Sequence, residues 1–136
     1  MAIVLFLLLV VMFGVEEFAR ALYSYHMVAN AARLGTRFAI VRGSGCVHTA
    51  LPDPWPCPAT SSEIENFVRV QSIGVGLDSP TVTTAWSAGS GCSQSPYEAQ
   101  GCIVSVTVTY PFHFIVPFVS SAAITMTSTS KMVISQ

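Results

Sequence analysis

Four cysteines carry the clearest chemistry in this chain. Cys46, Cys57, Cys92 and Cys102 lie in stretches rich in glycine, serine and proline. An even number of cysteines confined to such stretches favours disulfides formed in an oxidising compartment. Four cysteines permit three connectivities. We favour pairing of nearest neighbours, because each pair then brackets a stretch of little regular structure and closes a loop of about ten residues.

A zinc site is the alternative use of the first two cysteines. Cys46 and His48, followed by Cys57, would supply three ligands. We prefer the disulfide, because no CxxC spacing is present and the flanking prolines impose their own geometry. The other histidines, His26 and His113, have no sequence partner, and no HExxH, GxSxG, Walker or Rossmann pattern occurs. We therefore expect no catalytic residue, no metal and no cofactor, and a protein that is not an enzyme.

Two adjacent glutamates, Glu16 and Glu17, end a run of uncharged residues. Arg20 follows four residues after the first and three after the second, which is the favourable order for an ion pair on a helix. Adjacent residues point about 100° apart on a helix, so the two carboxylates cannot flank one substrate. Two interpretations stay open: an ion pair that allows burial in an apolar bundle, or glutamates that stay hydrated at a membrane surface.

The element that carries these charges begins with an apolar segment, Met1 to Val15. As a helix it covers about 22 Å, which is short of the hydrocarbon core of about 30 Å. A signal peptide is an alternative, since the length fits its apolar region. However, no lysine or arginine precedes the segment, no small-residue cleavage site follows it, and the helical pattern continues beyond it.

That pattern predicts one long helix over residues 1–42, with an apolar stalk at 1–15 and an amphipathic half at 16–42. Proline is absent before Leu51, good helix formers dominate, and only Gly14 and Gly35 weaken the pattern. We expect the amphipathic half to cover the head with a stripe of residues at helical spacing. The members of this stripe are Phe18, Leu22, Tyr25, Ala29, Ala32 and Thr36.

Small residues are dense in the same half, and we expect them to let another helix approach closely. These residues are Ala29, Ala31, Ala32 and Gly35.

Residues 43–136 are expected to form a small globular head. Ser61 or Ser62, with Glu65 as part of a capping box, predicts the start of a short helix over about 62–73. Alternation with a period of two predicts a half-buried strand at about 102–110. Further strands are expected at about 81–86 and 124–134, the last on an edge or beside the second. Short connections favour antiparallel pairing, which gives an α+β fold whose sheet is covered by the long helix.

The segment from Pro111 to Ala123 is too apolar for an ordinary surface loop. It either folds back as core or contacts a neighbouring subunit or a membrane surface. The candidate contact residues are Phe112, Phe114, Ile115 and Phe118.

The composition argues against a nucleic-acid-binding protein and against a freely soluble monomer. Charged residues make up 10% of the 136 residues, hydrophobic residues 51%, and the formal net charge is -1. A basic face for nucleic acid is therefore not expected. A chain with so few charges is usually held by lipid or by copies of itself, and a head of about 90 residues buries only a modest core.

The stretch "FGVEEFARALYSYHMVANAARLGTRFAIVRG" resembles the opening of TadE-like pseudopilins, the relatives of type IV pilins in the tight-adherence system. The matching positions are Phe13-Gly14, Glu17-Phe18, Arg20 to Tyr23, and Ala31 to Arg37. "VSVTVTYPFHFIVPF" and "ITMTSTSKMVI" look similar to the closing strands of that family. Together the two blocks cover about 80 residues. The resemblance implies a type IV pilin-like fold in a protein of the bacterial envelope.

The resemblance also implies how such a protein would work. It would enter the inner membrane, interact with the pilus assembly machinery, and reach an extracellular filament as a homo-oligomer held by its N-terminal helix. The leading expectation is a structural filament subunit. Its alternatives are a minor, membrane-anchored pseudopilin that primes or tips assembly, and a single-span protein with a binding head.

The assembly residues that we expect on this basis lie along the helix. They are Phe13, Gly14, Glu16, Glu17, Phe18, Arg20, Ala29, Ala32 and Gly35.

The chain departs from the family at its start. The family's basic leader ending in glycine, followed by a glutamate a few residues later, is missing before the apolar run. We expect that Met1 is an internal or misassigned start, or that the leader was never part of this chain; export by another route is the third explanation.

Overall fold

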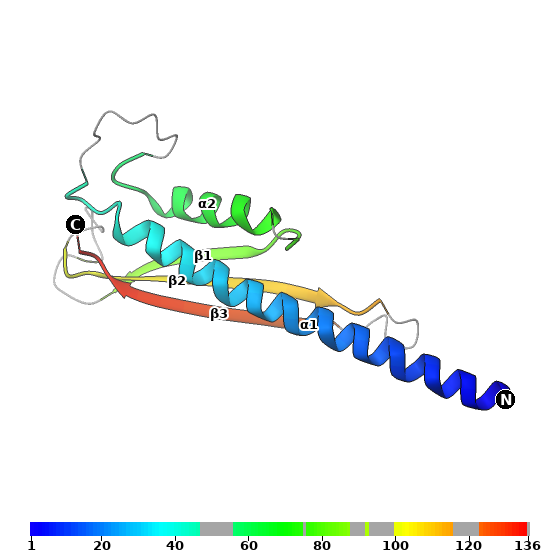
Figure 1. Ribbon diagram of the computed structural model, residues 1–136. Coiled ribbons are helices and arrows are strands. Elements are labelled where there is room, and N and C mark those ends of the chain that lie inside the picture. The colour runs from blue at the N-terminus through cyan, green and yellow to red at the C-terminus, as the bar shows by residue number, and fades with distance from the viewer. Residues whose placement is uncertain (47–55, 75, 88–91, 93–99, 116–122, 136) are drawn as a thin grey trace.

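The computed structural model consists of one long helix, one short helix and a small sheet (Figure 1). The elements are α1 (Ala2–Ile40), α2 (Ser61–Ile73), β1 (Thr81–Ser87), β2 (Ile103–His113) and β3 (Ala123–Val133). The structure describes residues 1–46, 56–74, 76–87, 92, 100–115 and 123–135.

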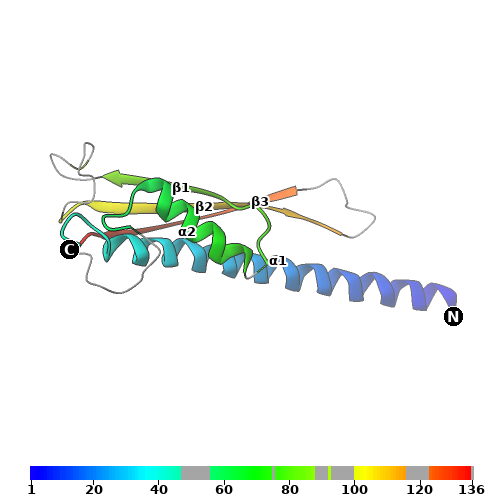
Figure 2. The same ribbon diagram turned by 90° about the horizontal axis from the view of Figure 1, so that it is seen from above.

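The sheet is antiparallel, with strand order β1-β2-β3. Both helices lie against the same face of it, so the head has two layers (Figures 1 and 2). Helix α1 packs on β2 and β3, while α2 packs on β1 and on α1. The predicted α+β fold with one short extra helix is confirmed, and β3 is both an edge strand and the neighbour of β2.

The core lies between the helices and the sheet. Alternation along β2 places Val104, Val106 and Val108 fully inside, as the period of two predicts. The opposite face of the sheet carries hydroxyl side chains, with Thr107 and Thr129 hydrogen-bonded at 2.9 Å across β2 and β3. One face of the sheet is therefore core and the other is polar.

The N-terminus of α2 differs from the sequence prediction by two residues. The cap is Thr60 rather than Ser61 or Ser62, and the N3 glutamate is Glu63 rather than Glu65. The Glu63 carboxylate accepts the backbone N–H of Thr60 at 2.7 Å. Glu65 instead accepts the backbone N–H of Thr84 at 3.0 Å, which ties α2 to β1.

Strand β2 is longer than predicted and includes Pro111 to His113. Proline is tolerated here because β1 begins at Thr81, opposite Thr109. Beyond that point β2 is an edge strand on the side of β1, and an edge accepts a residue that lacks an N–H. On the other side, Pro111 pairs with Thr125 of β3. The expected apolar loop thus begins as strand.

The stripe of α1 that faces the head is also not the predicted one in its first half. Phe18, Leu22 and Tyr25 are exposed by 70%, 47% and 55%. The buried face passes through Glu17 and Val28 instead, and reaches the predicted stripe only at Ala32 and Thr36. Moving the pattern by one residue turns it by about 100° on a helix, so the large side chains lie outside the core.

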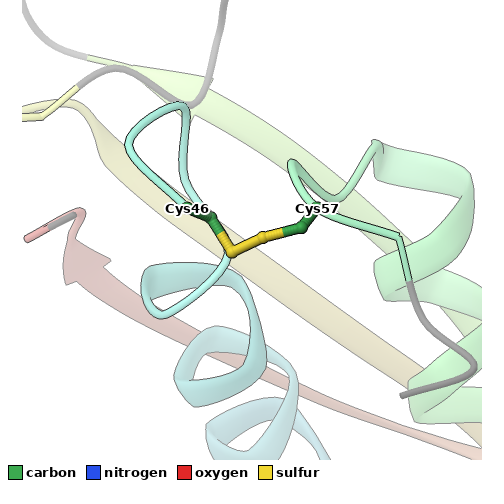
Figure 3. Close-up of a disulfide and its surroundings, with 2 residues drawn as sticks. All are labelled: Cys46 and Cys57. Carbon is green, nitrogen blue, oxygen red and sulfur yellow. A yellow bond between two sulfur atoms is a disulfide. The ribbon is translucent and has the colours of Figure 1, made fainter. Parts of the chain in front are cut away.

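Two disulfides close the head. One joins Cys46, after α1, to Cys57, before α2 (Figure 3). The other joins Cys92 to Cys102, at the start of β2. This is the nearest-neighbour pairing that we favour from the sequence.

Candidate assembly surface of the N-terminal helix

The first half of α1 projects beyond the head as a stalk (Figures 1 and 2). Every residue from Met1 to Glu16 is exposed, including Phe13 and Gly14. Helix α1 is long and apolar enough to cross a membrane, and little of its apolar stretch is buried by the rest of the chain. The stalk therefore presents its apolar side chains on every side.

One row of these side chains continues onto the half of α1 that is packed on the head. The row advances in alternating steps of four and three residues, which is the spacing of a seam between two packed helices. We call it the apolar seam. Its members, all exposed, are Val4, Leu8, Val11, Val15, Phe18, Leu22 and Tyr25.

Glu17 holds α1 against the head at the point where the exposed stalk ends. Its side chain is largely buried, and Arg20 Nη1 donates to its two carboxylate oxygens at 2.9 and 3.1 Å. The backbone N–H of Ile115 donates to Glu17 Oε1 at 3.0 Å. The guanidinium of Arg20 also lies 5.5 Å from the ring centroid of Phe112, within the range of a cation–π contact. The buried carboxylate thus has the partners that burial requires.

Glu16 has a different environment from Glu17. It is exposed, and in the described part of the chain it takes no part in an ion pair. The sequence allows Arg20 to pair with either glutamate, and the structure pairs it with Glu17. The Glu17 carboxylate therefore holds α1 against the head, and the Glu16 carboxylate is exposed.

Glu16 lies at the rim of a groove of about 880 Å³ between α1, the end of β2 and the turn after α2. A second exposed carboxylate, Asp78, lines the same groove. Tyr110 and Phe112 contribute aromatic walls. Arg20 is already paired with Glu17, and neither Glu16 nor Asp78 forms an ion pair with a described residue. With His113 and two tyrosines as the other titratable side chains that line it, the groove is acidic at neutral pH. We call it the acidic groove.

The apolar segment that begins at Pro111, within the last residues of β2, divides between the two uses that the sequence leaves open. Phe112 is buried, and its ring packs edge-on against Phe114 at 5.3 Å between centroids. Ile115 is 70% exposed beside the apolar stalk. Phe118 lies outside the described residues. The first part is thus core, while Ile115 remains available for a contact.

The small residues of α1 are placed otherwise than expected. Ala32 is fully buried in the head, and a Cβ on Gly35 would lie 2.6 Å from Val68 Cγ2 and 2.9 Å from Val106 Cγ1. These positions let α2 and the sheet of the same subunit approach α1, so they are not open to a helix of another copy. Ala31 is buried too, and Ala29 is half-buried.

The alternative zinc site loses two of its three ligands. The sulfurs of Cys46 and Cys57 are bonded to each other, so neither is a free thiolate. His48 lies outside the described residues. Among those described, no three histidine, cysteine, aspartate or glutamate side chains lie close enough to hold a metal ion.

Sequence reasoning missed the acidic groove and the register of the seam. Glu16 and Asp78 line the same groove although they are 62 positions apart in the sequence, and no local pattern predicts that they lie on one groove. The seam did have a signal, since its steps of four and three residues run from Val4 to Tyr25 without interruption. The stripe predicted from the sequence begins with three of these residues, Phe18, Leu22 and Tyr25, but places them against the head.

The fold and this surface define a protein that carries a small α+β head on an unbroken helix, half of which is an apolar stalk. The TadE-like protein family model matches residues 1–37, which are nearly all of α1. The match confirms the resemblance to TadE-like proteins over this helix. No curated protein and no solved structure matches the chain significantly. The TadE-like match and the apolar helix fit a pilus-associated subunit.

Proposed function

We propose that this protein is a structural subunit of an extracellular bacterial filament that polymerises through α1. The observation that carries the proposal is the apolar seam, which runs without a break from the stalk onto the half of α1 that is packed on the head. A seam of this spacing is a surface for another helix. The most direct source of such a helix is a second copy of the chain.

Energetics support an assembled state over a free monomer. Soluble monomers rarely expose apolar patches larger than a few hundred Å², and the stalk is exposed and apolar on all sides. Fully burying one large apolar side chain contributes about 1.5–3 kcal/mol, so the seam alone contributes on the order of 10 kcal/mol. Lipid satisfies this need before assembly, and neighbouring helices satisfy it afterwards.

The route of the protein follows from the same helix. The stalk would hold the subunit in the inner membrane, with the head and its disulfides in an oxidising compartment. The pilus assembly machinery would then move the subunit into the filament at the cell surface. Because α1 is continuous, the segment that first contacts lipid later forms the filament core. The role is structural, and no catalytic step is needed.

Electron microscopy of filaments sheared from cells tests this function. The expected result is a helical filament with this chain as its repeating subunit. A low copy number in the inner-membrane fraction would instead indicate the minor pseudopilin that primes or tips assembly. A monomeric membrane protein that never enters a filament would indicate a binding head.

A pair of variants tests the seam itself. Leu22→Asp places a charge in the seam and should abolish filaments while leaving the head folded, because Leu22 is outside the core. The matched control is Val70→Asp, at a position on α2 with 54% exposure. Normal filaments from Leu22→Asp would contradict a role for the seam.

A further inference from the structure

The exposed charges of α1 are divided by sign along its length. Glu16 stands at the start of the half that is packed on the head, and Arg33 and Arg37 stand near the end of α1. Both arginines are exposed, and neither forms an ion pair with a described residue. The helix therefore offers an acidic end and a basic end, and neither is paired with a charged residue in the part of the chain that the structure describes.

Glu16 and Arg33 face different directions. Arg33 lies 18 residues, which is about five helical turns, after Val15, so it points to the same side of α1 as the apolar seam, whereas Glu16 is turned by about 100° from Val15. Arg37 lies one turn beyond Arg33, turned by about 40° toward the groove side. Glu16 belongs to the acidic groove, together with Ala19, Arg20 and Tyr23. A contact between the seam of one copy and the groove side of another is therefore heterologous. Heterologous contacts build open, head-to-tail assemblies.

The distance along the helix axis between Glu16 and the two arginines gives the offset between the two copies. At 1.5 Å per residue, Glu16 lies about 26 Å along α1 from Arg33 and about 32 Å from Arg37. We propose that a second copy packs against α1 with a stagger of about 26–32 Å, so that its Arg33 and Arg37 enter the acidic groove beside Glu16 and Asp78. This inference rests on the proposed function and adds to it the register and the charged contact.

The chemistry of the groove suits arginine. A guanidinium donates to carboxylates in a fixed, planar geometry and stacks on aromatic rings, and the groove offers two exposed carboxylates and the ring of Tyr110. Arg20 cannot fill this role, because it already binds Glu17. A charge buried among packed apolar helices needs a partner, so wrong registers, which leave these charges unpaired, are disfavoured.

Charge reversal in the full chain, expressed with its own assembly machinery, tests the contact. One variant alters the acidic side (Glu16→Arg with Asp78→Asn), one alters the basic side (Arg33→Glu with Arg37→Glu), and one combines both. All four residues are exposed, so the head should fold in each variant. The matched control is Arg69→Glu, an exposed arginine on α2.

Each single-sided variant should lower the yield of sheared filaments by about tenfold or more, because like charges then meet across the interface. The combined variant should restore most of the yield, and Arg69→Glu should leave it unchanged. Normal yields from the single-sided variants, or no recovery in the combined one, would overturn the proposed register. A wild-type chain that never forms filaments would refute the proposed function instead.

Cross-linking gives a second measurement that does not depend on yield. A chain with both Glu16→Cys and Arg33→Cys should form a ladder of disulfide-linked copies in oxidised filaments, because each subunit reacts at both ends. Either cysteine alone should give no ladder beyond a dimer. Filaments of the double variant that stay monomeric on a non-reducing gel would also overturn the register.

Discussion

Two glycines on α1 should respond differently to the same substitution. Gly14 lies in the stalk, where a Cβ would meet nothing within 4 Å. Gly35 lies against the head, where a Cβ would lie 2.6 Å from Val68 and 2.9 Å from Val106. Alanine at either position improves helix propensity by about 1 kcal/mol. Only at Gly35 does the new methyl group have to displace its neighbours.

The magnitude for Gly35→Ala follows from two opposing terms. Overpacking in a well-packed core costs about 1–3 kcal/mol, and valine has little freedom to move because its χ1 is stiff. After the gain in propensity, we expect a net loss of about 1 kcal/mol, which lowers the melting temperature of a head of this size by about 4–8 °C. Gly14→Ala should leave the melting temperature of the head unchanged, because Gly14 lies in the stalk, which does not pack on the head.

The assay is thermal unfolding of the full chain in detergent micelles, followed by circular dichroism. Adding Val68→Ala removes the nearest clashing methyl group, so Gly35→Ala should destabilise that background less than it destabilises the wild type. The contact with Val106 remains, which keeps the recovery incomplete. Equal melting temperatures for Gly35→Ala and Gly14→Ala would refute the close packing of α1 on the head.

Two further predictions concern the glutamates and the cysteines. Glu17→Ala removes the acceptor of the Ile115 N–H and the partner of Arg20, and should lower the free energy of unfolding by about 1.5–3 kcal/mol, with the half-exposed ion pair contributing the smaller part. Glu16→Ala should change the free energy of unfolding by less than about 0.5 kcal/mol. Equal free energies of unfolding for the two variants, measured by chemical denaturation, would contradict the role of Glu17 in holding α1 against the head. Intact mass should show the loss of four hydrogens relative to the reduced chain, since all four cysteines are paired; thiols that react with a labelling reagent before reduction would contradict the pairing.

Periodicity explains how much of the fold could be read from the sequence. A run of helix formers without proline specified α1, and alternation specified the core of β2, because both signals are local and repeat many times. Local sequence does not fix the start of α2, since Thr60, Ser61 and Ser62 are all good N-cap residues. The cap residue depends on which glutamate side chain accepts a hydrogen bond from its backbone N–H. Glu65 was unavailable because it binds β1, a contact between distant parts of the chain.

In the candidate site, too, local sequence predicts some features and contacts between distant residues decide the others. The sequence identified Glu16, Glu17 and Arg20 as charges in need of partners, but it could not choose which glutamate Arg20 would bind. The backbone N–H of Ile115 decides that question from 98 positions away, by holding Glu17 against the head. The small residues were recognised as sites of close approach, yet only packing shows that the approaching groups are Val68 and Val106 of the same subunit.

The sequence by itself thus determined an apolar stalk, a continuous helix and an α+β head, because spacing along the chain encodes each of them. It favoured the nearest-neighbour pairing of the cysteines without excluding the other two connectivities. Tertiary structure alone decided which face of α1 the head covers. A rotation of about 100° separates the stripe through Phe18 from the one through Glu17. Periodicity alone favours the wrong stripe, because the large apolar residues Phe18 and Leu22 lie on the exposed side and a glutamate lies on the side that the head covers. Burying Glu17 with its partners leaves Phe18, Leu22 and Tyr25 exposed, and these residues form the surface that we propose for assembly.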